Sequence, residues 1–535
     1  MFDIMLGHNL IWKIGKDAVM VKKILGRVLV VVPALAIQVL WIVLLVKGVN
    51  WIADDYLVDV LNVLFRILAV IFVISIVNRR DESAYKILWV IVIVALPILG
   101  SIMYLFLGNK RTGAHLDRKI RRAEEALDRR AFYKNENIVS EIEKDDEHVA
   151  QIISHLSEDT NFPVLPNESV KYYPWGQDVF ADMREDLKKA KKYVYIEYFI
   201  IERGLFWDTL TDILAEKAKE GVDVRVIYDD LGSIGTYSVK DAKELKDRGI
   251  KCVPFNPLLF VRTQLNNRTH RKIMVIDGEV AYSGGINLAD EYINEIHPYG
   301  VWKDIGFRMT GKAVQSYQFM FLEFWNAIVP IDEIIIPEIP KIVDKPASID
   351  MSNMDGFIWP YYDSPEREEH TSNALFTEML SMATEYIWFY TPYLMLGDTL
   401  FDAFIRAARR GVDVRVIVPG TSDSKMVQQV AKTYYRDLVA AGVKIYEYTP
   451  GFVHAKAMIC DDKVAGVGTV NLDYRSLFLH YECFSVFYKS HLIDELKKDF
   501  LATQEECELK TLESIPNGVL TRFLNGVLRL IAPLM

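Results

Sequence analysis

The sequence predicts an α/β protein made of two duplicated halves and preceded by N-terminal transmembrane helices. The heptapeptide GVDVRVI occurs at residues 221–227 and again at 411–417, and the pattern His-x-Lys-x(4)-Asp occurs once in each half. Three long apolar segments lie before both halves. A repeat of this kind indicates duplicated structural units. The expected order is a membrane region with up to three transmembrane helices at 1–108, a charged connector at 109–160, a first half at 161–329, a linker at 330–360, a second half at 361–510 and an amphipathic helix at 511–535.

The chain is rich in apolar residues, and many of them lie in the N-terminal segments between residues 28 and 107. Of the 535 residues, 51% are hydrophobic, and the net charge is −10. This acidic balance argues against a nucleic-acid binder with a broad basic face. The four cysteines show no CxxC or zinc-ligand spacing, so we expect reduced thiols, no metal site and no cofactor.

The apolar segments have the length of membrane helices. Residues 28–46 and 87–107 carry no formal charge, and 56–77 contains three strongly polar residues. Each is close to the ~20 residues that cross a bilayer core. We therefore expect a multi-pass membrane protein. Basic residues flank the segments on conflicting sides, so the membrane side of the large domain stays open, as does whether all three segments fully span.

Each half shows strands alternating with helices. Apolar strands at 193–196 and 386–389 precede amphipathic helices at 208–220 and 399–410, and each helix ends at the glycine of GVDVRVI. Glycine after a periodic run is typical of a helix end. This alternation predicts an α/β fold with helices on both faces of a sheet.

The last residues of the chain have apolar side chains at helical spacing. From Gly518 to Met535 the apolar residues form one stripe, with Arg522 and Arg529 among them. This pattern predicts an amphipathic helix that lies either on a membrane surface or on the protein's own core.

The densest polar signature has the same spacing in both halves. It consists of a histidine, a lysine two residues later, an aspartate five residues after the lysine, and an asparagine that ends a Gly-x-x-Asn turn: His270, Lys272, Asp277 and Asn287, then His454, Lys456, Asp461 and Asn471. Alternation places each His and Lys on one face of a buried strand. Burying such groups is costly unless a charged ligand satisfies them, and a phosphate would do so.

This signature resembles the HKD motif of the phospholipase D superfamily, and two copies in one chain make the resemblance specific. Family members pack two α/β halves about a pseudo-twofold axis, so that both motifs form one site. Further stretches resemble bacterial cardiolipin synthases, namely 89–108, 196–200, 229–233, 321–325, 442–456 and 529–534. The chain departs from that family in its extra N-terminal segment and in Asn267-Arg268-Thr269 before the first motif.

The resemblance implies roles for these residues. His270 and His454 would be nucleophile and general acid/base, with His270 favoured as the nucleophile that forms a phosphohistidine. Lys272 and Lys456 would hold the nonbridging oxygens, together with the phosphate-binding Asn287 and Asn471.

Four carboxylates complete the implied site. Asp304 would orient His270, and Glu482 would orient His454. Asp277 and Asp461, the aspartates of the two motifs, would support the site through backbone and lysine contacts.

The implied reaction is that of a cardiolipin synthase in a bacterial cell membrane. A phosphatidyl group would pass from one phosphatidylglycerol to the primary hydroxyl of another, with release of glycerol. A membrane-bound phospholipase D that hydrolyses phospholipids would use the same residues and is the main alternative. A nuclease of the superfamily and a non-catalytic membrane scaffold fit less well. The acceptor lipid, its acyl chains and the oligomeric state stay open.

Overall fold

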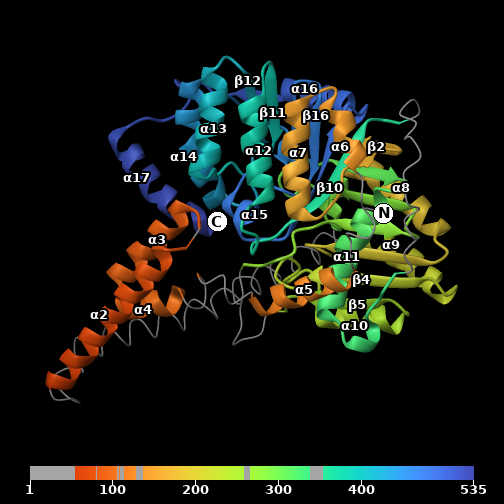
Figure 1. Cartoon of the computed structure of the whole chain (residues 1–535), viewed down its shortest axis with the longest axis horizontal. Helices are drawn as coiled ribbons and strands as arrows, with labels where there is room; N and C mark the ends of the chain where they lie inside the picture. Colours follow the sequence, from red (N-terminus) through yellow and green to blue (C-terminus); the bar gives the residue numbers. More distant parts are fainter. Residues whose placement is uncertain are drawn as a thin grey trace, which may run out of the picture. The chain divides into compact units, whose positions relative to one another are not determined.

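The computed structural model describes residues 55–79, 81–104, 108, 114–127, 136–257, 266–337 and 354–535. The chain divides into two compact units (Figure 1). The first contains Met1–Asn109 and Ser233–Ser238, and the second contains Lys110–Gly232 and Val239–Met535. We describe each unit by itself.

Three helices make up the described part of the first unit. They are α2 (Asp55–Val77), α3 (Ser83–Ala95) and α4 (Pro97–Met103). Ala69 and Ile76 of α2 pack with Trp89 and Ile93 of α3 in a small apolar cluster. The expected helix at 56–77 is therefore present as α2, and the expected segment at 28–46 lies outside the described residues.

The expectation of one continuous span at 87–107 is wrong. The helix ends at Ala95, and Leu96 adopts φ −135° and ψ 73° before α4 begins. Proline disfavours helical geometry in the residue before it, so Pro97 explains the break. Gly100 permits the close return of the chain, because a Cβ there would lie 2.4 Å from the Val92 carbonyl oxygen. Across the part of the chain that the structure describes, no helix combines the length and apolar character needed to cross a bilayer.

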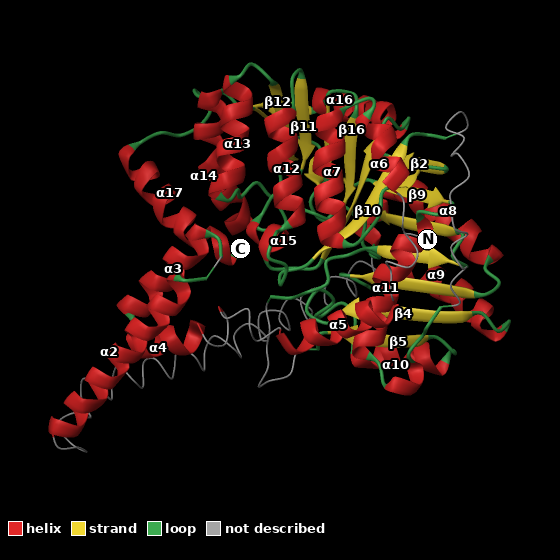
Figure 2. Ribbon diagram, viewed as in Figure 1, coloured by secondary structure: helices red, strands yellow, loops and turns green. Residues whose placement is uncertain are grey.

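The second unit is built on two large mixed sheets (Figure 2). One has the order β2-β9-β7-β6-β3-β4-β5 and the other the order β1-β10-β17-β16-β15-β11-β12-β13-β18. The strands of the first sheet are β2 (Ser169–Tyr173), β3 (Tyr193–Tyr198), β4 (Asp223–Asp229), β5 (Lys251–Phe255), β6 (Ile273–Ile276), β7 (Val280–Gly284) and β9 (Gly306–Thr310). Those of the second are β1 (Leu165–Pro166), β10 (Phe357–Asp363), β11 (Tyr386–Tyr390), β12 (Asp413–Pro419), β13 (Lys444–Tyr448), β15 (Ala457–Cys460), β16 (Val464–Gly468), β17 (Glu482–Tyr488) and β18 (Cys507–Leu509).

The strand orders show that the halves are duplicates. Without its edge strands β1 and β18, the second sheet repeats the first sheet strand for strand. The heptapeptide copies form β4 and β12, which lie parallel to β3 and β11 respectively. The predicted α/β duplication is confirmed.

Helices cover the sheets. In Figure 2, α12 lies between α7 and α13 over the larger sheet. The α-helices of this unit are α5 (Ala114–Leu127), α6 (Glu136–Glu143), α7 (Glu147–Thr160), α8 (Gly176–Lys189), α9 (Leu205–Lys219), α10 (Val239–Asp247), α11 (Val314–Ile328), α12 (Thr371–Met382), α13 (Asp398–Arg409), α14 (Lys425–Ala441), α15 (Tyr474–Phe478), α16 (Leu492–Glu505) and α17 (Val519–Ile531). Short 3₁₀ turns are η5 (Asp290–Ile293), η6 (Ile331–Glu333) and η8 (Ala532–Leu534).

A small parallel ladder joins the two halves. Strand β8 (Val301–Lys303) of the first half pairs with β14 (Gly451–Val453) of the second. The backbones approach so closely at Gly451 that a Cβ there would lie 2.2 Å from the Val301 carbonyl oxygen. Asp304 follows β8 directly, and His454 follows β14 directly, so this ladder brings residues from both halves to one place.

Candidate active site

The His-x-Lys segments lie just before the strands on which the sequence placed them. Strand β6 begins at Ile273 and β15 at Ala457, one residue after each lysine. The expectation that each His and Lys belongs to a core strand is therefore wrong. The reason is a change of backbone partner: the His270 N–H donates to the Tyr481 carbonyl at 2.8 Å, and the His454 N–H donates to the Lys303 carbonyl at 2.7 Å. Each His-x-Lys segment therefore lies outside the sheet of its own half, and its histidine N–H bonds to a backbone carbonyl of the other half.

Two buried carboxylates hold the first segment in place. Glu197 of β3 accepts hydrogen bonds from the guanidinium of Arg271 at 2.6 and 3.0 Å. Asp229 of β4 accepts from Arg268 at 2.9 Å and from the Thr269 N–H at 3.0 Å. The paired charges satisfy each other, as buried ions require. Both arginines flank the histidine, so the ends of β3 and β4 set its position.

Each imidazole is paired with a carboxylate of the other half. His270 Nδ1 lies 2.9 Å from both carboxylate oxygens of Glu482. His454 Nδ1 lies 2.6 Å from Asp304 Oδ2. The expected assignment of Asp304 to His270 and Glu482 to His454 is thus reversed. The crossing follows from the backbone bonds, since Glu482 follows the Tyr481 that binds the first segment and Asp304 follows the Lys303 that binds the second.

The residues that contact the carboxylates Glu482 and Asp304 differ between the halves. Thr469 donates from Oγ1 to Glu482 Oε2 at 2.5 Å. The equivalent position in the first half is Gly285, where a Cβ would lie only 2.1 Å from Asp304 Oδ1. Asp304 instead accepts from the Ile305 N–H at 2.8 Å. The Thr469 hydroxyl thus supports Glu482, whereas Gly285, which has no side chain, leaves room for Asp304.

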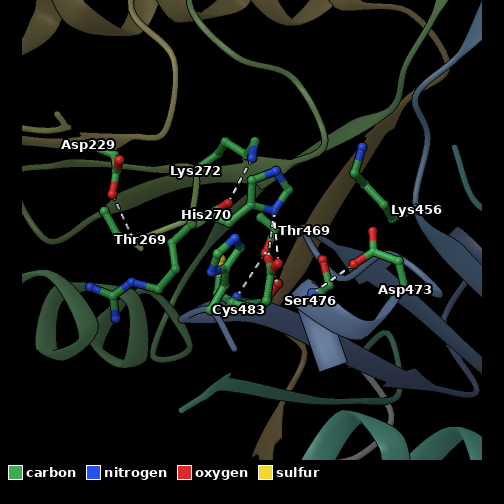
Figure 3. Close-up of polar contacts among 12 residues, drawn as sticks. Asp229, Thr269, His270, Lys272, Lys456, Thr469, Asp473, Ser476 and Cys483 are labelled. Atoms are coloured by element: carbon green, nitrogen blue, oxygen red, sulfur yellow. Dashed lines mark hydrogen bonds and ion pairs between the residues drawn. The ribbon is translucent and has the colours of Figure 1, made fainter. Parts of the chain in front are cut away.

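The two motif lysines share the site with the histidines. Lys272 Nζ donates to the His270 carbonyl at 2.7 Å, and Lys456 Nζ donates to the His454 carbonyl. Figure 3 shows Lys272 and Lys456, which belong to different halves, on either side of His270. Burial lowers the pKa of Lys272 to about 8. Burial, together with the charge of Lys272, helps to lower the pKa of Lys456 to about 7.

Electrostatics distinguish the two His–carboxylate pairs. Burial, and then the charges of Lys272 and Lys456, hold the pKa of His270 well below its usual value. Burial raises the pKa of Glu482 to about 7, against the opposing charge of Lys272. Both groups of this pair are thus shifted toward their neutral forms.

The second pair keeps its negative charge. Burial and then Lys456 lower the pKa of His454 to about 3, although Asp304 acts in the opposite direction. Burial raises the pKa of Asp304, but the charges of His454 and Lys456 outweigh this effect, and the pKa is lowered overall. Asp304 is therefore a carboxylate ready to stabilise a protonated His454.

The two predicted phosphate-binding asparagines are not equivalent. Asn287 accepts from the Ile200 N–H at 3.1 Å and donates to the Tyr292 hydroxyl at 2.7 Å, so its amide is committed to the protein. In the second half the corresponding backbone N–H, that of Tyr393, donates to Thr391 Oγ1 at 3.4 Å. Asn471 Oδ1 is consequently buried with no hydrogen-bond partner among the described residues.

The motif aspartates lie away from the imidazoles, at the far ends of β6 and β15. Asp277 accepts hydrogen bonds from the backbone N–H groups of Lys191, Lys192 and Tyr193 at 2.7 to 3.0 Å. Asp461 accepts in the same way from the first residues of β11 and the turn before it. Both therefore fix the start of a neighbouring strand. Their expected backbone contacts are present.

Several residues of the site escaped the sequence reasoning. Besides Thr469, Asp473 lies beside Lys456 in Figure 3, and it caps α15 by accepting from the Ser476 N–H at 2.9 Å. Aromatic rings face the imidazoles: Phe199 lies 4.9 Å from His270 and Tyr292 lies 5.3 Å from His454, centroid to centroid. The one available signal was Thr469 itself, because it replaces a glycine between two otherwise matching motifs.

This arrangement suits displacement at a phosphodiester. Two imidazoles whose Nδ1 atoms face carboxylates leave Nε2 for chemistry, one as a nucleophile and one as a proton carrier. Two lysines stand beside them to balance the charge of a phosphate.

Comparison with known proteins supports this interpretation. The family model described as "Cardiolipin synthase, PLD-like domain" matches residues 183–324 and 376–503, and one described as "Phospholipase_D-nuclease N-terminal" matches 67–109. The cardiolipin synthase model covers both His-x-Lys segments, the first in 183–324 and the second in 376–503.

Similar proteins cover most of the chain. An uncharacterized protein of Streptococcus mutans is 38% identical over 86% of this chain and 99% of its own length. A cardiolipin synthase of Halalkalibacterium halodurans is 31% identical over 90% of this chain and 95% of its own length. The crystal structure of phosphatidylserine synthase from Haemophilus influenzae has the same fold, with a TM-score of 0.55 and 13% identity, and covers 72% of this chain and 100% of that chain.

Proposed function

Because this chain belongs to the cardiolipin synthase family of phospholipase D-like proteins, we propose that it transfers a phosphatidyl group between two phosphatidylglycerol molecules and releases glycerol. Donor and acceptor would be the same lipid. The observation that carries the proposal is the crossed pairing of His270 with Glu482 and of His454 with Asp304, with Lys272 and Lys456 bonded to the backbone of the two histidines.

The reaction proceeds in two displacements. His270 Nε2 attacks the phosphorus of the first lipid, the bond from phosphorus to the glycerol oxygen breaks, and His454 gives that oxygen a proton. His454 then takes the proton of the acceptor's primary hydroxyl, whose oxygen attacks phosphorus and breaks the bond to His270. Cardiolipin leaves, and both imidazoles return to their starting state.

The electrostatic difference between the pairs supports this division of roles. A neutral His270 whose Nδ1–H donates to Glu482 keeps its Nε2 lone pair for attack. His454 must be protonated in the first step, and the ionised Asp304 favours that form. A bound phosphodiester offsets the charge of Lys456, which raises the pKa of His454 toward that needed for a general acid.

The lysines bind the phosphate, and the asparagines have other roles. Lys272 and Lys456 balance the nonbridging oxygens as charge builds on phosphorus. Asn471, with its free Oδ1, accepts a hydrogen bond from a hydroxyl of a lipid headgroup. Asn287 acts through Tyr292 and the backbone and does not bind the phosphate directly.

Product analysis tests the proposal. The purified full-length chain is incubated with phosphatidylglycerol as the sole lipid, and the products are separated by mass. Cardiolipin with an equal amount of glycerol is the expected result, and His270→Ala is the inactive control. Phosphatidic acid with glycerol and no cardiolipin would identify a hydrolytic phospholipase D instead.

The substrate also implies the location. Phosphatidylglycerol and cardiolipin are bilayer lipids, so the protein acts at a bacterial cell membrane. Reacting lipids must reach a buried site in which His270 and His454 are 8% and 6% exposed. Exclusion of water at such a site favours transfer over hydrolysis.

A further inference from the structure

The C-terminal helix α17 exposes a continuous apolar face. No residue of this helix is buried. Seven apolar side chains of α17 and η8 are between 40% and 79% exposed: Val519, Leu520, Phe523, Leu524, Val527, Leu530 and Leu534. In a helix these positions fall on one side, so the face is a stripe and not a scatter of single residues.

The opposite face of α17 is attached to the protein. The Arg529 guanidinium donates to the Thr433 carbonyl of α14 at 2.7 Å and pairs with Asp437 at the same distance. It also lies over the Tyr434 ring, 4.7 Å from the centroid. The helix therefore has a defined orientation, with its apolar side turned outward.

The charge of this region indicates which partner covers the apolar face of α17. No acidic residue follows Glu513 in a chain whose net charge is −10. Arg522 is exposed and lies about 60° around the helix from Val519 at the edge of the apolar stripe. A long cationic side chain there can reach phosphate groups while the stripe enters the acyl region. An apolar stripe with a cationic side chain near one edge and no acidic residue fits an anionic lipid surface better than an acidic second copy of this chain.

The end of α17 is connected to the catalytic segment. Ala532 of η8 is fully buried, and the Arg475 guanidinium of α15 donates to the Leu534 carbonyl at 2.6 Å. Helix α15 begins three residues after Asn471, and Asp473 caps it. The short helix α15 thus connects η8 to the second motif.

We propose that α17 docks on the anionic phospholipid surface of a bilayer and, through η8 and α15, seats the second catalytic motif at the level of the lipid headgroups. The inference rests on the proposed function for its substrate, and on the exposed stripe for the docking itself. Docking in this orientation delivers lipid headgroups to the site without removing the whole lipid from the membrane.

Spin labelling tests the docking in the full-length chain. A label at Phe523→Cys is compared with one at Asn525→Cys, which lies about 200° around the same helix. Cys507→Ser removes the partly exposed thiol, while the other three cysteines are buried. With vesicles containing phosphatidylglycerol, the label at 523 should gain oxygen collisions and lose collisions with a water-soluble nickel chelate, and the label at 525 should not.

Two outcomes would overturn the docking. Nickel collisions at 523 that stay unchanged on adding vesicles would show that the stripe meets no bilayer. Protection at 523 in buffer without vesicles or detergent would show that a second copy or another part of the chain covers it.

Activity provides an independent comparison. In a Leu520→Glu, Phe523→Glu double variant, turnover of vesicle phosphatidylglycerol should fall about tenfold or more, while turnover of a monomeric short-chain phosphatidylglycerol stays within about twofold. Val239→Glu is the matched control, since Val239 is 79% exposed on a helix remote in sequence from α17. An equal loss on both substrates would contradict the inference. Failure of the wild type to make cardiolipin from either substrate would reject the proposed function and leave the labelling result to decide the docking.

Discussion

At the scale of single residues, the two catalytic pairs differ in the charge they carry before substrate binds. Glu482 has a pKa raised to about 7 by burial, whereas the pKa of Asp304 is lowered by His454 and Lys456 despite burial. A carboxylate that stays ionised stabilises an imidazolium more than one that is only partly ionised at neutral pH. This asymmetry predicts which histidine becomes covalently modified.

Replacing each carboxylate should affect the covalent adduct differently. Asp304→Asn impairs His454 as the acid of the first step and as the base of the second, but it leaves the pair of His270 with Glu482 intact, so an adduct that forms should be on His270. Glu482→Gln impairs the nucleophile, so no adduct should form. Either change should lower turnover about 10²- to 10⁴-fold. Mass spectrometry of rapidly denatured, digested enzyme detects the modified peptide. An adduct on His454 in Glu482→Gln would reverse the assigned roles.

The motif lysines predict a pH dependence. Burial lowers the pKa of Lys272 to about 8 and that of Lys456 to about 7, although nearby carboxylates act in the opposite direction. The protonated forms bind phosphate, so kcat/KM should fall as pH rises through this window, because kcat/KM reports groups of the free enzyme. Lys456→Arg, which stays charged, should move the alkaline fall upward toward the pKa of Lys272. A fall at unchanged pH in this variant would assign the titration to another group.

At the scale of elements, the site is assembled from segments that leave one sheet and bond to the other half. The turn after β7 illustrates how tightly this assembly is packed. Gly285 follows β7 directly, and its missing side chain leaves room for the Asp304 carboxylate that holds His454. The corresponding turn after β16 carries Thr469, whose hydroxyl supports Glu482.

Gly285→Ala should therefore inactivate the enzyme without unfolding it. A Cβ at 2.1 Å from Asp304 Oδ1 forces the carboxylate to move away from His454. We expect a loss of turnover of at least about 10²-fold, as for removal of an acid–base group, with an unchanged melting temperature to within a few degrees. Gly526→Ala is the matched control, because no atom lies within 4 Å of a Cβ there. Full activity of Gly285→Ala would show that Asp304 tolerates displacement.

At the scale of the whole molecule, a buried ion pair helps to join the two halves. Lys303 of β8 donates to Asp499 of α16 at 2.7 and 2.9 Å and to the Pro174 carbonyl at 2.6 Å. Lys303 is 1% exposed, and Tyr172 donates to the same carboxylate. Since Lys303 also accepts the His454 N–H bond, the interface and the active site share one residue.

Lys303→Met should destabilise the catalytic unit. Removing one partner of a buried pair leaves an uncompensated charge and costs about 3–5 kcal/mol. Thermal unfolding followed by tryptophan fluorescence should show a lower midpoint, and adding Asp499→Leu should recover part of the loss. Lys171→Met is the control, since the pair of Lys171 with Asp182 is largely exposed and worth little. Equal destabilisation by both lysine changes would contradict a special role for the buried pair.

The duplicated fold and the residues that form the candidate site were predictable from the sequence, because the patterns that indicate them are local. Strand and helix periodicity, helix-ending glycines and the repeat of GVDVRVI are local patterns, and the structure turns them into β3, α9 and β4 and their duplicates β11, α13 and β12. The two His-x-Lys pairs were recognisable because buried polar side chains at a repeated spacing are costly without a function.

Tertiary structure alone decided how these parts meet. Which carboxylate holds which imidazole depends on backbone bonds between Tyr481 and His270 and between Lys303 and His454, residues more than a hundred positions apart. No local pattern records such a pairing. The break before Pro97 was readable in principle, but an apolar composition alone suggested one long span. The sequence by itself thus determined the elements and the chemistry they carry, whereas the crossed site arose only from packing, because contacts distant in sequence set its geometry.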